Sequence, residues 1–268
     1  MKSTIRRFLA NNRTAAEAVA RTTGLFTKAV RQANVAMFHP GRCGSTVVGM
    51  LLNQHPKVKW AGEIFAQIKS KYGKESWVWE RPYEMIKLRT NIYVSKVFGI
   101  EIKKKHFNDV KMTKKEIIKL FNKMEYDKFI VLERKNYLSR RVSSIVGDKI
   151  GTWNTDETVN PPKVYVPTKH GDGSTIIDDF EDNDKFFEDI NEILKEKDIL
   201  NISYEEDIRD DPKKAFNKII KYIGIKRVNV KVETKKINNR PISDRISNFE
   251  QVSDCLRGTK YEWMVRQV

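Results

Sequence analysis

Apolar residues gather in short runs along the chain, and residues at helical spacing follow directly after several of them. The runs at residues 35–38 and 128–134 predict buried strands, with helices expected from Val47 and from Asn136. A strand that leads at once into a helix is the repeating unit of parallel α/β folds. The pattern therefore predicts an α/β protein with three α/β/α layers and a central, mostly parallel sheet. Further strands are expected at residues 57–61, 92–98 and 199–204.

Other segments show helical spacing without a preceding strand. Thr113 is expected to cap a helix that runs to about Met124, because threonine is a favoured N-cap residue. Apolar stripes predict helices at residues 178–198, 212–223 and 246–256.

Two segments differ from the single domain expected over residues 35–268. Residues 1–34 carry apolar side chains at roughly helical spacing and basic residues on the other face. This predicts an amphipathic helical segment that packs on the domain, with contact to a membrane surface or to a partner as alternatives. Residues 151–176 are rich in Gly, Pro, Thr and Asp, which predicts an insertion or a lid loop.

Composition narrows the class of partner. The formal net charge is +16, which favours phosphate-bearing or polyanionic partners. The lysines are scattered, however, and no nucleic-acid-binding module is recognisable, so no nucleic-acid partner is expected. Two cysteines, Cys43 and Cys255, do not make a disulfide framework. No apolar run approaches the ~18 residues of a membrane span and no signal peptide is visible, so a cytoplasmic location is expected.

The clearest chemical signal lies between the first strand and the first helix. Backbone N–H groups and the positive end of a helix bind a phosphate well, and Arg42 adds a fixed cation with several donors. Arg, Ser and Thr inside one glycine-containing turn therefore predict a phosphate site. Its expected contacts are Gly41, Arg42, Cys43, Gly44, Ser45 and Thr46.

A second βα unit carries further basic residues. Arg134 and Lys135 stand at the carboxyl end of the strand at residues 128–134, and Ser143 lies within the following helix. Ligands of open α/β sheets bind at this edge. We therefore expect these side chains to lie near the first phosphate site.

Three segments together resemble the sulfotransferases that use 3′-phosphoadenosine-5′-phosphosulfate (PAPS), whose fold is similar to that of P-loop NTPases. Residues 39–46 resemble the 5′-phosphosulfate loop of that family, and Arg134-Lys135-Asn136 with Ser143 resembles its 3′-phosphate motif. Residues 201–212 resemble its strand-Tyr-Glu-Asp-helix segment. The C-terminal residues 238–263 are also similar to bacterial members, so the resemblance covers about residues 35–263.

The resemblance implies direct in-line transfer of a sulfuryl group from PAPS to a hydroxyl or amine, with no metal. Arg42 would then neutralise charge on the leaving oxygen. Arg134 and Ser143 would bind the 3′-phosphate, with Lys135 as the alternative cation. Arg257 and Gly258 resemble a second nucleotide-contact motif. Cys43 is expected to have a lowered pKa beside Arg42 and a helix end, yet to serve as a small loop filler that is open to oxidation.

Transfer also requires a base that takes the proton of the acceptor. Glu63 stands where carbohydrate- and tyrosine-modifying members carry a glutamate base, and it is competent only if its pKa is raised. His106 is the alternative, because small-molecule members use a histidine after a later strand. Glu63 can instead cap the next helix.

Two other functions are weighed against sulfuryl transfer. A nucleotide-dependent kinase requires a loop lysine and a carboxylate for Mg²⁺, and neither is recognisable in the sequence. A basic nucleic-acid-binding protein without activity is the other alternative. Trp77, Trp79 and Tyr83, together with the loop at residues 151–176, suggest an aromatic acceptor pocket suited to a carbohydrate or a glycolipid.

Overall fold

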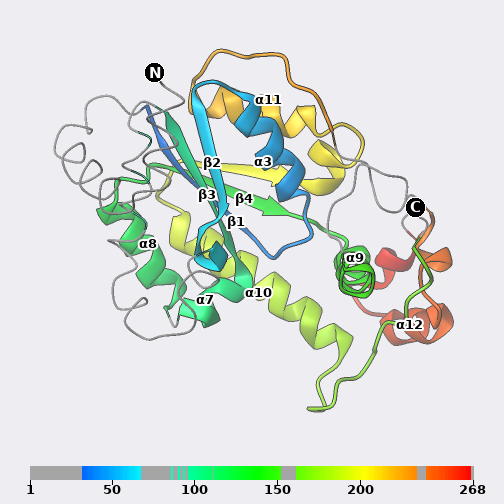
Figure 1. The fold of residues 1–268 in the computed structure, drawn as a ribbon. Coiled ribbons are helices and arrows are strands. Elements are labelled where there is room, and N and C mark those ends of the chain that lie inside the picture. The colour runs from blue at the N-terminus through cyan, green and yellow to red at the C-terminus, as the bar shows by residue number, and fades with distance from the viewer. Residues whose placement is uncertain are drawn as a thin grey trace.

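The computed structural model describes residues 32–67, 86, 90, 93, 96–110, 112–151, 161–233 and 240–266. Within this part of the chain, five strands form one sheet in the order β2-β3-β1-β4-β5, and every neighbouring pair is parallel (Figure 1). This confirms the predicted α/β fold with a parallel sheet. The strands are β1 (Asn34–His39), β2 (Val58–Glu63), β3 (Val97–Lys103), β4 (Lys128–Glu133) and β5 (Ile199–Ser203).

Helices cover both faces of this sheet, which gives the three predicted layers (Figure 1). Val35 and Met37 of β1 pack into one apolar cluster, with α3 (Ser45–Gln54) and α11 (Lys213–Ile223). Ala36 and Phe38 pack into the other, so β1 is buried on both faces. The helices of this second layer and of the C-terminal side are α7 (Lys104–Val110), α8 (Lys114–Lys123), α9 (Tyr137–Ile150), α10 (Ile176–Leu194) and α12 (Phe249–Leu256).

Side-chain caps explain where two of the helices begin. Thr113 and Glu116 form a capping box at the start of α8, as expected for a helix capped by Thr113. Thr175 and Asp178 form a second capping box, so α10 begins at Ile176, two residues before the predicted position. The same helix ends at Leu194, because the chain turns there to enter β5.

The third strand is shifted from its predicted position. The strand expected at residues 92–98 is observed as β3, at Val97–Lys103. Phe98, Ile100 and Ile102 of this strand pack into one apolar cluster, which is the alternation of a strand. Gly99 and Glu101 interrupt the apolar pattern on the other face. For that reason the sequence pattern did not predict a strand at this position.

Part of the predicted loop at residues 151–176 packs into the domain. Val164 and Val166 are buried, and Val164 N donates to Arg245 O at 2.9 Å, while Ser247 N donates to Val164 O at 2.9 Å. The stretch after residue 160 is thus hydrogen-bonded to the C-terminal segment. A lid role for residues 151–176 stays a prediction.

Several predictions fall outside the described residues. They concern the N-terminal segment up to residue 31 and the aromatic residues Trp77, Trp79 and Tyr83. In the part that is described, no helix is both long and apolar enough to cross a membrane.

Candidate functional site

The loop between β1 and α3 has the geometry of an anion site. Gly41, Arg42 and Gly44 have positive φ angles of 92°, 56° and 82°. For Arg42 this conformation costs on the order of 1–3 kcal/mol, a strain that is typical of functional loops. Gly44 caps α3 without a side-chain hydrogen bond, and the first turn of α3 holds no acidic residue. The N-cap residue and the first turn of α3 therefore provide no side-chain acceptor for the backbone N–H groups at the positive end of this helix, which faces the loop.

The start of α9, at the same edge of the sheet, is already capped. Asn136 Oδ1 accepts from Ser139 N at 2.7 Å, and the Glu205 carboxylate accepts from Lys135 N and Asn136 N at 3.1 Å each. Because a carboxylate already occupies this helix end, a second anion beside α9 must be held by side chains.

Buried and half-buried arginines supply such side chains. Arg42 donates through Nε and Nη2 to Ser143 Oγ at 3.2 and 3.0 Å. Arg134 donates through Nη1 to Arg42 O at 3.1 Å, and its guanidinium lies 4.2 Å from the centroid of the Tyr204 ring. Arg134 and Arg245 are each only 8% exposed. Within the described part of the chain, the buried Nε atoms of Arg134, Arg140 and Arg245 have no hydrogen-bond partner.

These arginines lie close enough to repel one another. Burial lowers the pKa of Arg42 and of Arg245, and the positive charge of Arg134 lowers both further. Burial also lowers the pKa of Arg140. The guanidinium groups stay protonated despite these lowered pKa values, so their positive charges repel one another. A bound anion would reduce this repulsion. We call Arg134, Arg140 and Arg245 the arginine cage.

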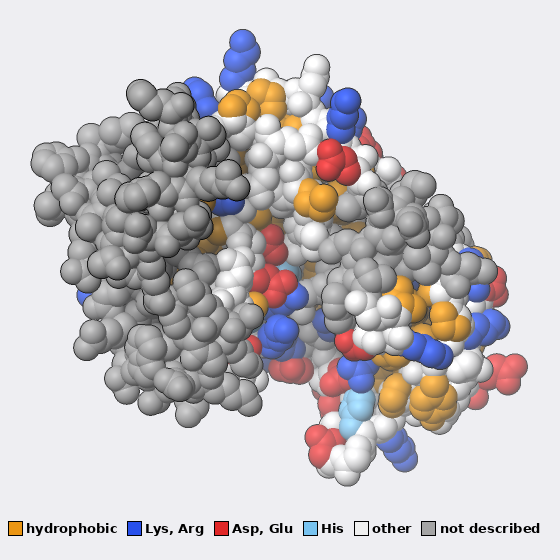
Figure 2. Space-filling view, viewed as in Figure 1, with side chains coloured by type: hydrophobic (Ala, Val, Ile, Leu, Met, Phe, Trp, Pro, Cys, Tyr) orange, Lys and Arg blue, Asp and Glu red, His pale blue; other side chains and the backbone are white. Residues whose placement is uncertain are grey.

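The loop and the arginine cage line one cavity of about 800 Å³. Basic and acidic side chains gather in the hollow at the centre of the molecule (Figure 2). Loop residues Gly41, Arg42, Gly44, Ser45 and Thr46 line the cavity, as does Ser143. The cations Lys103, Lys105 and Arg209 complete the lining, against the acids Glu63 and Asp210.

Three predicted site residues take other positions. Lys135 is exposed and pairs with Glu206 at 2.6 Å, which leaves Arg134 as the cation of this pair that faces the cavity. Arg257 is exposed and pairs with Asp254 at 2.5 Å, and Gly258 N donates to Glu262. Neither Arg257 nor Gly258 lines the cavity.

The cation that the C-terminal segment does contribute to the cavity is Arg245. The sequence argument missed it, because Arg245 stands in no motif. Arg140 lay within a predicted helix, where an exposed position is the ordinary expectation. Only the packing of α9 against the loop shows that Arg140 faces inward.

Cys43 differs from its predicted chemistry. The side chain is completely buried, and Sγ donates to Gly41 O at 3.1 Å. Burial raises the pKa of the Cys43 thiol to about 12, so the prediction of a lowered pKa was wrong. The effect of burial exceeds that of Arg140 and Arg134, whose charges act in the opposite direction. Cys43 therefore fills space under the loop and is not a nucleophile.

The two candidate bases lie side by side. Glu63 Oε1 is 2.5 Å from Lys103 Nζ, and Glu63 Oε2 is 3.6 Å from His106 Nε2. His106 Nδ1 accepts from Lys103 N at 3.0 Å, so the neutral ring carries its proton on Nε2, toward Glu63. Glu63 lines the cavity, whereas His106 is completely buried behind it. An acceptor in the cavity would therefore meet Glu63.

The pKa of Glu63 is lower than that of an efficient general base. Burial raises it, but hydrogen bonding with His106 and Lys103 outweighs burial and lowers the pKa of Glu63 to about 2. Burial lowers the pKa of His106, against the opposing effect of Glu63. The raised pKa that Glu63 would need as a base is thus absent while Lys103 is its partner.

A buried carboxylate beneath the loop escaped the sequence argument. Glu101 of β3 is 4% exposed, accepts from Trp60 Nε1 at 2.7 Å, and lies 3.2 Å from His39 Nε2. Burial raises the pKa of Glu101, but hydrogen bonds from His39, Trp60 and Ser45 lower it overall. His39 Nδ1 in turn accepts from Gly41 N at 3.2 Å, so this network holds the loop at both ends.

The Glu101 network also bears on metal binding. Trp60 Nε1 donates to one carboxylate oxygen and His39 Nε2 lies 3.2 Å from the other, so a loop-bound cation would have to displace these groups. In the described part of the chain, no group of three His, Cys, Asp or Glu side chains is placed to hold a metal.

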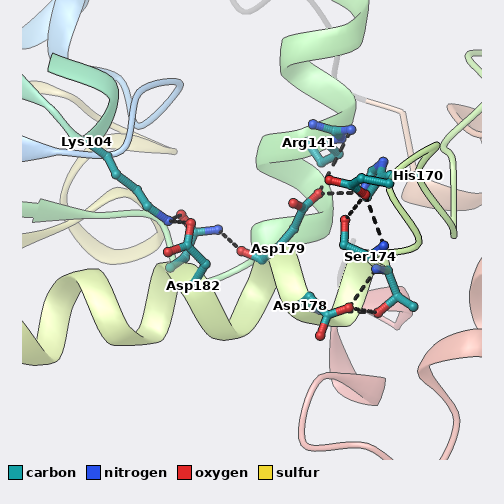
Figure 3. A network of polar contacts seen from close by, with 10 residues as sticks. Lys104, Arg141, His170, Ser174, Asp178, Asp179 and Asp182 are labelled. Atoms are coloured by element: carbon teal, nitrogen blue, oxygen red, sulfur yellow. Dashed lines mark hydrogen bonds and ion pairs between the residues drawn. The ribbon is translucent and has the colours of Figure 1, made fainter. Parts of the chain in front are cut away.

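A second polar network links α10 to α7 and α9 (Figure 3). Asp179 of α10 lies 3.0 Å from His170 and 4.0 Å from Arg141 of α9. Lys104 of α7 pairs with Asp182 of α10. These contacts tie α10 to α7 and α9, and so help to set the position of α9, which carries Arg140 and Ser143.

Comparison with known proteins gives matches among solved structures. No family model matches the chain, and no curated protein matches it. Among solved structures, the chain is similar to a sulfotransferase from Alicyclobacillus acidocaldarius, with 9% identity and a TM-score of 0.45. The match covers 88% of this chain and 96% of that chain. Function therefore has to be argued from the residues that line the cavity.

Proposed function

We propose that the protein is a sulfotransferase that uses PAPS and modifies a hydroxyl or amine of a carbohydrate or glycolipid. The observation that supports this most is that the loop before α3 and the arginine cage line one cavity. The loop before α3 offers a helix end and Arg42, and the arginine cage offers side chains. A nucleotide with phosphate groups on both its 3′ and 5′ sides needs two such sites.

The residues present fit such a donor. The N–H groups at the start of α3 and the Arg42 guanidinium would hold the 5′ end, and Arg134, Arg245 and Ser143 would hold the 3′-phosphate. Ser45 would act through its backbone N–H, because its hydroxyl acts on the buried Glu101 and lowers the pKa of that carboxyl. When bound, PAPS supplies a sulfuryl group whose bond to the 5′-phosphate oxygen breaks as the acceptor oxygen or nitrogen bonds to sulfur.

Side chains of the protein stabilise the charge on the leaving group and take the proton of the acceptor. Arg42 stabilises the negative charge that grows on the leaving phosphate oxygen, and it stays protonated throughout. Glu63 is the base that takes the proton of the acceptor, because it faces the cavity and His106 does not. His106 supports Glu63 from behind, through the proton on Nε2.

The two alternative functions agree less well with the site. A kinase would need a loop lysine and a carboxylate that is available to Mg²⁺, whereas this loop carries Arg42 and its nearby carboxylate Glu101 is already hydrogen-bonded. A nucleic-acid-binding protein would present cations along an open surface. Here Arg134 and Arg245 are buried inside a cavity.

Titration calorimetry with 3′-phosphoadenosine-5′-phosphate (PAP) tests the proposal. We expect roughly micromolar binding to the wild type, and loss of binding in Arg42→Ala and in Arg134→Ala. Arg257→Ala is the matched control, because this exposed arginine does not line the cavity. Absence of binding to the wild type, or equal losses in all three variants, would overturn the proposal.

A further inference from the structure

Lys103 lies between the base and the anion loop. It is the last residue of β3 and pairs in register with His39 of β1, at the point where the loop begins. A Cβ atom added to Gly41 would lie 3.4 Å from Lys103 Cε, so the lysine side chain runs directly along the loop. Its ammonium is 2.5 Å from Glu63 Oε1. Lys103, Gly41 and Glu63 all line the same cavity.

The charges around Glu63 make it a poor base in this arrangement. Lys103 reaches it from the end of β3, His106 from α7, and His39 acts on it from the end of β1. A carboxylate with a pKa of about 2 accepts a proton weakly, since efficient bases have pKa values near the working pH. For Glu63 to act, one of these contacts has to be released.

Lys103 is the contact that can be released. Its backbone N donates to His106 Nδ1 and fixes the histidine ring, but its ammonium stands at the end of a flexible chain that lines the cavity. His106, in contrast, is completely buried and held at Nδ1. An anion placed at the start of α3 would therefore compete with Glu63 for the ammonium of Lys103.

We propose that Lys103 is shared between Glu63 and the sulfuryl end of the donor, and that its move to the donor oxygens frees Glu63 to act as the base. This inference rests on the proposed function. The sharing of Lys103 makes Glu63 active as a base only when the donor is bound. The acceptor proton then passes to Glu63 while the acceptor–sulfur bond forms and the sulfur–oxygen bond to the 5′-phosphate breaks, and the proton later leaves to solvent.

The test follows the Glu63 carboxyl by carbon NMR on ¹³C-labelled protein, in the free state, with PAP and with PAPS. We expect the pKa of Glu63 to rise when PAPS binds and to rise less with PAP, which lacks the sulfuryl group. Lys103→Met should raise the pKa of Glu63 in the free protein and remove the further rise caused by PAPS.

Lys119→Met is the control, because Lys119 is an exposed lysine of α8 that does not line the cavity. It should leave both the pKa of Glu63 and the response to PAPS as in the wild type. If PAP and PAPS bind but the Glu63 titration is the same with and without PAPS, the sharing of Lys103 is wrong and the proposed function stands. If neither nucleotide binds, both are wrong.

Discussion

Arg42 donates through two of its nitrogens to a single acceptor, the hydroxyl oxygen of Ser143, at 3.2 and 3.0 Å. The contact joins the anion loop to α9 across 101 residues of sequence. It aims the guanidinium toward the cavity before any ligand is present. A cation that is already oriented costs little reorganisation when charge develops on a bound group, which is the condition for electrostatic catalysis.

The first prediction concerns this contact. Ser143→Ala removes the acceptor of both Arg42 donors and one contact to the proposed 3′-phosphate. Hydrogen bonds to charged groups contribute about 1.5–3 kcal/mol, so we expect affinity for PAP to fall about tenfold or more. Titration calorimetry measures it. Wild-type affinity in this variant would contradict the role given to Ser143.

A second prediction distinguishes two arginines of the C-terminal segment. Arg245 is buried in the arginine cage, whereas Arg257 is exposed and pairs with Asp254. We expect Arg245→Ala to weaken PAP binding by about tenfold to a hundredfold, since a buried charged donor is lost, and Arg257→Ala to change it by less than about twofold. The reverse order would restore the motif-based assignment of Arg257.

The third prediction concerns the packing beneath the loop. A Cβ atom at Gly99 would lie 1.9 Å from Trp60 Cε3, in the space that lets Trp60 reach Glu101. Gly99→Ala should therefore lower the free energy of unfolding by about 1–3 kcal/mol or more. Gly171→Ala is the control, because a Cβ atom there meets nothing within 4 Å. Urea denaturation compares them, and equal effects would contradict the close contact.

A fourth prediction follows from the lowered pKa of Glu63, which is about 2 against an ordinary value of 4.5. A group whose pKa is lower in the folded state stabilises the protein above its unfolded pKa, and this stabilisation is lost as the pH falls toward the folded pKa. The wild type should therefore lose stability relative to Glu63→Gln between about pH 4.5 and pH 2. Urea denaturation at several pH values checks this. A constant difference between the two proteins would show that Lys103 and His106 do not hold Glu63 as described.

Local patterns in the sequence were sufficient for most of the fold. The apolar run at residues 128–134 corresponds to β4, and Thr113 caps α8 as predicted. The loop after β1 was predicted from glycines next to a helix start, which is a property of neighbouring residues. Where the pattern was broken by Gly99 and Glu101, the predicted strand was displaced from β3.

The chemistry of single groups depended on partners that are distant in sequence. Cys43 was expected to be acidic from its neighbours, but burial by the packed sheet raises its pKa to about 12. Glu63 was a candidate base that would be competent only with a raised pKa, but Lys103 and His106 reach it from β3 and α7 and lower its pKa. Arg245 is buried and lines the cavity, and its segment is held by backbone hydrogen bonds with Val164.

The sequence by itself determined the order of strands and helices and the anion loop, because these depend on period, glycine and helix ends, and its resemblance to a family singled out Glu63 as the candidate base. Only the tertiary structure decided which cations face the cavity and in which protonation state each group is held. Burial and charge–charge contacts set those properties, and both arise from residues that the fold brings together over long distances in the chain.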